Sequence, residues 1–152
     1  MIEIYQGDIF EPPIDIVIHQ ANCMNTMGAG IAKEIRKRYP RAYDVDQMTK
    51  KGDIKKLGQF TFAAPDENQK QWVINLYGQF AYGRDKQYTN YIAIASGLRN
   101  ILSWIEKMGL ENQIIGIKEG MGCKNAGGDW EIVFGLIKEI FENSKVKVFI
   151  CI

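Results

Sequence analysis

The sequence has little of the residue types that build common metal and disulfide sites. It contains one histidine, His19, and three widely spaced cysteines with no C-x-x-C pair. An odd number of scattered cysteines gives poor support to a disulfide framework, and one histidine adds little to a zinc site. We therefore expect no metal site, no cofactor and a reducing compartment.

Neither an excess of charge nor a long apolar segment is present. The 19 basic and 18 acidic side chains leave a formal net charge of +1, so no global field would attract nucleic acid or an anionic membrane. No stretch approaches the roughly 18 apolar residues of a membrane span. The first residues, MIEIYQGD, show no basic region followed by an apolar run. We expect a cytoplasmic monomer without membrane or general nucleic-acid binding.

The sequence does have enough apolar residues to form one hydrophobic core. Its 152 residues are 46% apolar and 11% aromatic, which fits a single domain over residues 1–152. Short apolar runs alternate with helical patterns, and this alternation predicts a three-layer α/β domain. The predicted strands are Ile2–Tyr5, Ile14–His19, Gln59–Ala64, Trp72–Tyr77, Ile114–Ile117 and Val146–Ile152, and the predicted helices are Gly28–Tyr39, Tyr91–Met108 and a segment from Asp129 to Phe141.

Two glycine-containing loops each run from a strand into a helix. They are NCMNTMGAG, residues 22–30, and KEGMGCKNAGGDW, residues 118–130. Ligands collect at the carboxyl ends of strands in an open α/β sheet, where helix amino termini offer free N–H groups. Glycines allow the backbone amides to approach an anion closely. The two loops together predict a site for a diphosphate.

A dinucleotide-binding oxidoreductase is one alternative, because GAG followed by Ile31 is similar to G-x-G-x-x-G. Lys33 replaces the third glycine, and eight residues separate His19 from Gly28, where a dinucleotide turn would follow its strand directly. The spacing disfavours this function.

Five stretches in order resemble the successive motifs of the macro domain family: GDIF (7–10), HQANC (19–23), MGAGIA (27–32), NLYGQ (75–79) and GCKNAGGDW (122–130). The similarity covers nearly the whole chain. It is nearest to the branch of ADP-ribose 1''-phosphate phosphatases and small ADP-ribosyl hydrolases. The resemblance implies a macro domain fold, with a mixed, mostly parallel six-stranded sheet between helices and ADP-ribose in a cleft at the sheet edge.

The resemblance also implies roles for individual residues. Asp8 matches the aspartate that reads adenine, with Ile9 beside it, and Asn22 matches the asparagine that binds the distal ribose. Without the resemblance, Asp8 and Asn22 are ordinary turn residues. The two phosphate-binding loops match Gly28, Ala29, Gly30 and Ile31, and Gly122, Cys123, Lys124, Asn125, Ala126 and Gly127.

His19 is the main catalytic candidate that the resemblance implies, with Asp129 second. An imidazole can exchange a proton at the 1''-phosphate or attack phosphorus. The alternatives are a buried histidine bonded to backbone and a helix-capping aspartate. The resemblance also implies that hydrolases of this branch that act on acidic side chains or on thymidine bases have a lysine where this chain has Gln79 and Phe80. The protein-directed hydrolases add an acidic residue near the position of Ala126. The resemblance therefore favours a phosphatase, with an ADP-ribosyl hydrolase or a non-catalytic ADP-ribose reader as alternatives.

Overall fold

Six strands form one sheet through the centre of the computed structural model, which describes all 152 residues. The order in the sheet is β1-β6-β5-β2-β4-β3. Every neighbouring pair is parallel except β3 and β4, which are antiparallel. The predicted mixed, mostly parallel sheet is therefore confirmed. The strands are β1 (Ile2–Tyr5), β2 (Ile16–Asn22), β3 (Phe60–Ala63), β4 (Trp72–Gln79), β5 (Ile114–Lys118) and β6 (Lys147–Cys151).

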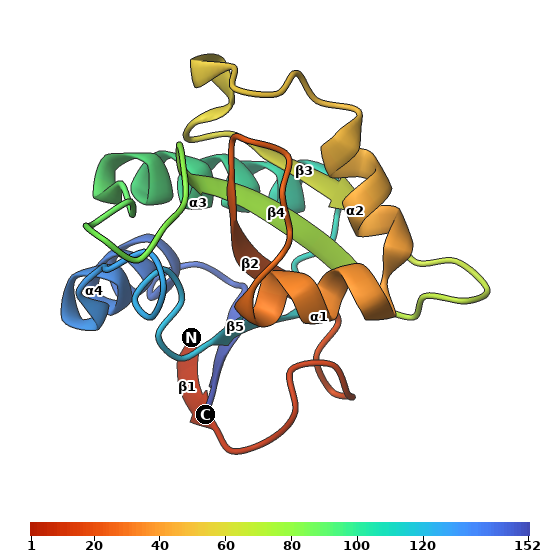
Figure 1. Cartoon of the computed structure of the whole chain (residues 1–152). Coiled ribbons are helices and arrows are strands. Elements are labelled where there is room, and N and C mark those ends of the chain that lie inside the picture. Colours follow the sequence, from red (N-terminus) through yellow and green to blue (C-terminus); the bar gives the residue numbers. More distant parts are fainter.

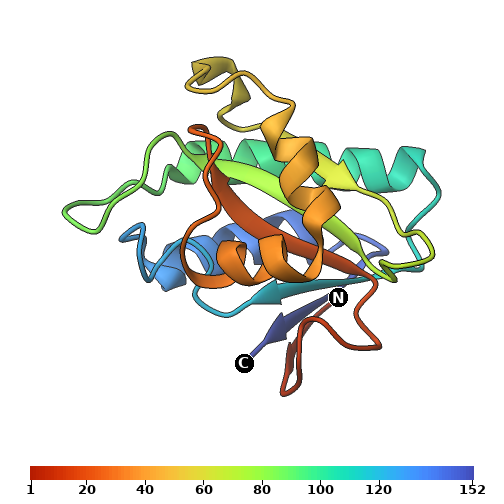
Figure 2. The ribbon, with the colours of Figure 1, turned by 45° about the vertical axis from the view of Figure 1, so that its right-hand side comes forward.

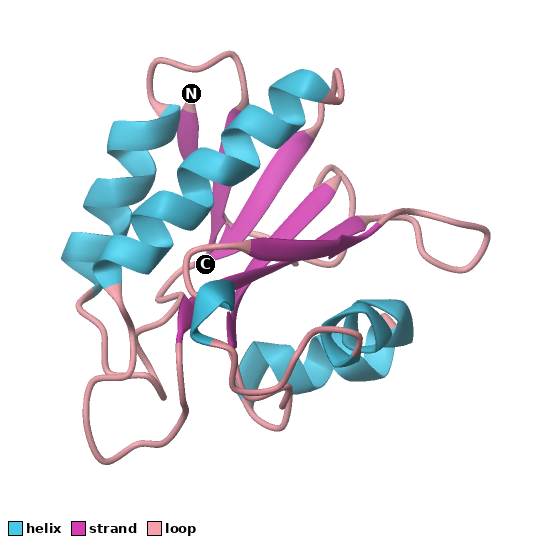
Figure 3. Ribbon diagram, turned by 90° about the horizontal axis from the view of Figure 1, so that it is seen from above, coloured by secondary structure: helices cyan, strands magenta, loops and turns pink.

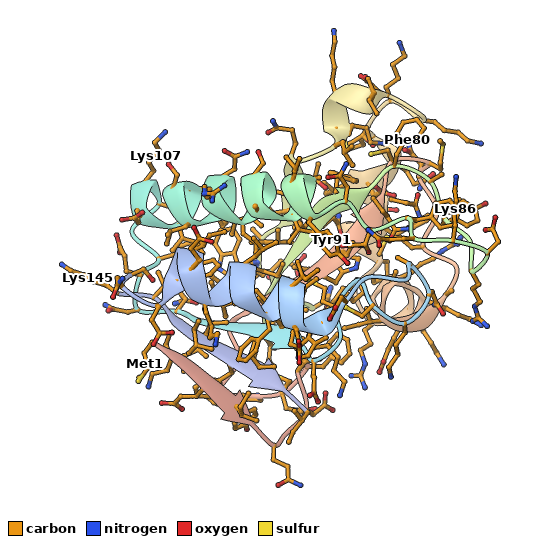
Figure 4. The ribbon with its side chains drawn as sticks, turned by 90° about the vertical axis from the view of Figure 1, so that its left-hand side faces the viewer. Met1, Phe80, Lys86, Tyr91, Lys107 and Lys145 are labelled. Atoms are coloured by element: carbon orange, nitrogen blue, oxygen red, sulfur yellow. The ribbon has the colours of Figure 1, made fainter.

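Helices cover both faces of the sheet and give three layers (Figure 1, Figure 3). On one face, α3 and α4 lie side by side, and Figure 4 places Lys107 and Lys145 at one end of this pair and Lys86 at the other. The opposite face is covered by α1 and α2. The helices are α1 (Gly30–Arg38), α2 (Pro40–Gln47), α3 (Tyr91–Lys107) and α4 (Trp130–Phe141), with a 3-10 turn at Ile54–Lys56. None of these helices combines the length and apolar character needed to cross a membrane.

Strand β2 contributes to both halves of the core because its side chains alternate between the two faces. Ile16 and Ile18 belong to the apolar cluster under α3 and α4, whereas Val17 belongs to the cluster under α1 and α2. By the same alternation, His19 lies on the face of Val17. The strand begins with three apolar residues, and all of its residues except Asn22 are buried.

Two elements differ from the sequence prediction. The second strand starts at Ile16 and continues to Asn22, so His19 lies in the middle of a strand and not at its carboxyl end. The helix α2 was not predicted, since the expected helix ended at Tyr39 and none was expected directly after it. Pro40 occupies the first turn of α2, where its missing N–H has no intrahelical partner to lose.

Candidate functional site

A cavity of about 1010 Å³ opens at the carboxyl ends of the parallel strands. Its wall is formed by the segment after β1, the end of β2, the start of α1 and the loop after β5. Apart from Gly127 and Asp129, every residue that the sequence analysis assigned to the site lines this cavity. The fold thus brings together residues that are more than one hundred positions apart in the chain.

The first glycine loop delivers an uncapped helix end to the cavity. Ala29 is the N-cap of α1 and makes no side-chain capping bond, and the first turn contains no acidic residue. The N–H groups of that turn therefore have no intrahelical acceptor and carry the positive end of the helix dipole. Gly30 adopts a φ of +57°, which favours glycine. This arrangement suits a bound anion.

The two glycine loops lie next to one another. A Cβ atom placed on Gly30 would come within 3.5 Å of the Asn125 Nδ2 in the second loop. Gly28, in contrast, faces open space, with no atom within 4 Å of an added Cβ. Backbone from both loops can therefore approach one ligand group.

Side chains of the sheet hold the second glycine loop in place. The hydroxyl of Thr89 donates a hydrogen bond to the carbonyl oxygen of Gly122 at 2.5 Å and accepts one from Gln20 Nε2 at 3.0 Å. Gly122 has a φ of +76°, and a Cβ there would lie 2.8 Å from Gln20 Oε1. Both the dihedral angle and the close approach require glycine at this position.

Asp8 and Asn22 both line the cavity while stabilising local turns. Asp8 Oδ1 accepts a hydrogen bond from the Phe10 N–H at 2.9 Å, and Asn22 Oδ1 accepts one from the Met24 N–H at 2.9 Å. Asn22 Nδ2 also donates to the carbonyl oxygen of Thr26. The turn roles are thus present, and the proposed contacts to adenine and to ribose stay predictions.

Charges of both signs surround the cavity. The exposed Lys124 lies in its wall, as do Gln79 at the end of β4 and Tyr82 and Arg84 from the following loop, which projects from the molecule in Figure 2. Lys86 of the same loop is not part of the wall. The cationic side chains in the wall are Arg36, Arg84, Lys118 and Lys124, and the carboxylates are Asp8, Glu34 and Glu119.

Asp129 caps α4 and does not line the cavity. Its Oδ1 accepts a hydrogen bond from the Glu131 N–H at 2.9 Å, which is the capping geometry. Gly127 also lies outside the cavity wall. A catalytic role for Asp129 stays a prediction without a contact to support it.

His19 lines the cavity although only 1% of its surface is exposed. Burial lowers the pKa of His19 from 6.5 to about 4, and a hydrogen bond with Asn75 offsets part of that effect. The imidazole is therefore neutral at pH 7. Its Nε2 lies 2.6 Å from Asn75 Oδ1 on β4, and a backbone hydrogen bond with Gln20 also raises the pKa of the imidazole.

A buried lysine that the sequence analysis missed supports the first loop. Lys56 Nζ donates hydrogen bonds to the carbonyl oxygen of Cys23 at 3.1 Å, to Asn25 Oδ1 at 2.5 Å and to the carbonyl oxygen of Lys50 at 3.1 Å. Asn25 lines the cavity and has a φ of +58°. Nothing in the local pattern IKKLG separates Lys56 from an exposed lysine, because its acceptors come from distant parts of the chain.

The cysteines are poor candidates for nucleophiles. Burial raises the pKa of Cys23 and that of Cys123, and it raises the pKa of Cys151 to about 11. All three are therefore thiols at neutral pH, and only the thiolate is strongly nucleophilic. No group of three His, Cys, Asp or Glu side chains is arranged to hold a metal ion.

Comparisons with known proteins identify the fold. No family model matches the chain. It is 30% identical over 139 residues to an uncharacterised 17.5 kDa protein of Enterobacteria phage T4, covering 88% of this chain and 83% of the relative. The structure superimposes on the macrodomain of Mycobacterium tuberculosis DarG with a TM-score of 0.80 at 19% identity, covering 99% and 97% of the two chains.

The chain has the macro domain fold. Other relatives carry names that describe reactions. An ADP-ribose 1''-phosphate phosphatase of Aspergillus oryzae is 23% identical, with 94% of this chain and 89% of the relative covered. A DNA ADP-ribosyl glycohydrolase of Mycobacterium tuberculosis is 24% identical over 88% of this chain, which spans 36% of that relative. A structure of Thermosipho africanus DarTG in complex with ADP-ribose has a TM-score of 0.75 at 19% identity, over 95% of this chain and 39% of that one.

Proposed function

We propose that this macro domain binds ADP-ribose in the cavity and removes the phosphate from ADP-ribose 1''-phosphate. The observation that carries the proposal is the meeting of the two glycine loops, with Gly30 of one next to Asn125 of the other, beside an uncapped helix end. Free N–H groups at such a helix end bind phosphate oxygens. The structure of Thermosipho africanus DarTG with ADP-ribose supports the choice of ligand.

The ligand would extend across the cavity from Asp8 to Asn22. Asp8, an acceptor when ionised, would accept a hydrogen bond from the exocyclic amine of adenine, with Ile9 beside the base. The diphosphate would lie between the glycine loops, and the distal ribose would lie near Asn22. Lys124 in the cavity wall would add a favourable charge next to a phosphate.

The proposed reaction is hydrolysis of the 1''-phosphate ester. Water adds to phosphorus, the bond from phosphorus to the ribose oxygen breaks, and ADP-ribose and inorganic phosphate are released. His19 is the residue of the cavity wall best suited to handle the proton or to attack phosphorus. The Aspergillus oryzae phosphatase, similar over 94% of this chain, supports this reaction.

Cleavage of an ADP-ribosyl bond on DNA or protein is the second candidate, favoured by the similarity to the mycobacterial DNA ADP-ribosyl glycohydrolase. Gln79 and Ala126 both line the cavity at the positions where protein-directed hydrolases of the family have a lysine and an acid. Neither side chain can supply the proton transfer or the charge of those groups. A lysine-dependent mechanism is therefore disfavoured at these positions.

Phosphate release from ADP-ribose 1''-phosphate tests the proposal directly, measured for the wild type and for His19→Ala. Losing a general acid or base should reduce turnover about a hundredfold or more. Turnover within a few-fold of the wild type in His19→Ala would contradict the role of His19. ADP-ribose binding in a calorimetric titration without any phosphate release would identify a reader, and release of ADP-ribose from modified DNA or protein would identify an ADP-ribosyl hydrolase.

A further inference from the structure

The side-chain amide of Asn75 has only one orientation that its neighbours accept. Asn75 lies on β4 directly beside His19 of β2, in register, and is completely buried. Its Nδ2 lies 3.0 Å from the carbonyl oxygen of Ala42, which can only accept a hydrogen bond. The amide nitrogen must therefore face Ala42, and the amide oxygen must face the imidazole.

A second contact enforces the same orientation. Asn75 Nδ2 also donates to Thr61 Oγ1 at 3.1 Å, and Thr61 Oγ1 lies 3.0 Å from the Tyr77 hydroxyl. The Tyr77 hydroxyl in turn donates to Asp46 Oδ1 at 2.7 Å. With the proton of Tyr77 directed at Asp46, Thr61 donates to Tyr77 and keeps a lone pair for Asn75. Four hydrogen bonds then link His19 to Asn75, Asn75 to Thr61, Thr61 to Tyr77 and Tyr77 to Asp46. All four donate in the same direction, toward the carboxylate of Asp46, so that each polarises the next.

We propose that Asn75, locked by Ala42 and Thr61, holds His19 as the tautomer with its proton on Nε2 and leaves Nδ1 unprotonated. The His19 Nε2 lies 2.6 Å from Asn75 Oδ1, an atom that only accepts, so this nitrogen donates. Nδ1 is buried and has no side-chain hydrogen-bond partner. Asn75 is thus a positioning residue.

The tautomer restricts the chemical roles that His19 can have in the reaction, and this step rests on the proposed function. A neutral imidazole protonated at Nε2 has only Nδ1 left for a ligand, and Nδ1 is buried in the free protein and carries no proton to give. His19 therefore acts as a base toward the attacking water or as a nucleophile toward phosphorus, and not as a general acid. The proton that Nδ1 takes up returns to solvent or to product as the cycle closes.

Nitrogen NMR of the single histidine tests the tautomer without any ligand or activity. With 15N-labelled histidine, only His19 contributes signals, because the chain has no other. At pH 7 we expect a pyrrole-type signal for Nε2 and a pyridine-type signal for Nδ1. The reverse pattern, or averaged signals from a tautomer mixture, in the wild-type protein would overturn the proposal.

Variants test whether Asn75 is responsible. Asn75→Leu should move both nitrogen signals toward averaged values, because Nε2 loses its acceptor. Asn100→Leu is the matched control: Asn100 lies on α3, outside the cavity wall, and donates one bond to the carbonyl oxygen of Gly58. It should leave both signals unchanged. If Asn75→Leu folds and its nitrogen signals equal those of the wild type, Asn75 has no positioning role. If the variant does not fold, the spectrum of the wild-type protein alone decides which tautomer His19 adopts.

Addition of ADP-ribose separates this inference from the proposed function. If calorimetry shows binding, the Nδ1 signal should shift while the Nε2 signal stays nearly constant. Binding that leaves the Nδ1 signal unchanged would contradict the use of this lone pair. Absence of binding would instead contradict the proposed ligand, and the tautomer found in the free protein would stand.

Discussion

The ammonium group of Lys56 lies 3.1 Å from the carbonyl oxygen of Cys23, in the loop that carries Asn22 to the cavity. Two further acceptors, on Asn25 and Lys50, complete the three hydrogen bonds that an ammonium group can donate. A buried cation with every donor satisfied stabilises the loop conformation, including the left-handed backbone at Asn25. The shape of the cavity thus depends on a side chain that does not line it.

Lys56→Met should therefore lower both stability and ligand affinity. The methionine keeps most of the volume but leaves acceptors unpaired, which costs about 2 to 4 kcal/mol of unfolding free energy. We expect ADP-ribose to bind at least several-fold more weakly as the loop loosens. Lys55→Met, one position earlier in the 3-10 turn and exposed, is the matched control. Urea unfolding and calorimetry measure both effects, and equal values for the two variants would contradict the anchoring role.

The burial of His19 predicts a loss of stability in acid. The pKa of His19 in the folded protein is about 4, below the usual value of 6.5. Between these two pH values the imidazole is protonated in the unfolded chain but stays neutral in the folded protein. The neutral, buried His19 thus contributes to the free energy of unfolding. The contribution is fully present above pH 6.5 and is lost as the pH falls through 4, and the total loss reaches about 3 kcal/mol.

His19→Gln provides the comparison for that pH dependence. Glutamine can still donate to Asn75 Oδ1 but does not titrate. Burial raises the pKa of Asp46, which acts in the opposite direction, so the difference between wild type and variant isolates the histidine. Urea unfolding at pH 7 and at pH 4.5 should show a smaller decrease for the variant. Parallel decreases would contradict a low pKa for His19.

Gly28→Val should weaken ADP-ribose binding about tenfold without unfolding the protein. Nothing lies within 4 Å of an added Cβ at Gly28, so the side chain is accommodated but occupies space that the ligand phosphates need. Gly135→Val in α4 also meets open space and lies outside the cavity wall. Calorimetry on both folded variants should show a loss for Gly28→Val alone, and unchanged affinity in that variant would contradict the placement of the phosphates.

Two substitutions at Asp129 separate capping from chemistry. Asp129→Asn keeps a side-chain oxygen for the Glu131 N–H, whereas Asp129→Ala should lose about 1 kcal/mol of stability with the cap. Because Asp129 does not line the cavity, we expect Asp129→Asn to keep phosphate release within a few-fold of the wild type. A loss of a hundredfold or more would establish the catalytic role that the resemblance implied.

Much of the fold could be predicted because its signals are local. Alternation of apolar strands with helical periodicity indicated the three-layer architecture, and the two glycine loops indicated where the cavity lies. The helix α2 was missed because Pro40 both ends one pattern and begins the next, and local sequence does not separate these roles. The end of the second strand was missed because His19 and Gln20 are polar residues whose side-chain partners lie on other elements.

The sequence by itself determined where the two glycine loops follow their strands, since strand ends and glycine turns follow from apolar pattern and backbone preference. The individual residues assigned to the cavity came from the resemblance. Only the tertiary structure decided the state of His19. Its burial and its alignment with Asn75 arise when β2 and β4 pair, and the orientation of Asn75 depends on the Ala42 carbonyl of a helix from another part of the chain. Proton positions follow from such long-range contacts, because hydrogen bonding and solvent exclusion act through space and not along the sequence.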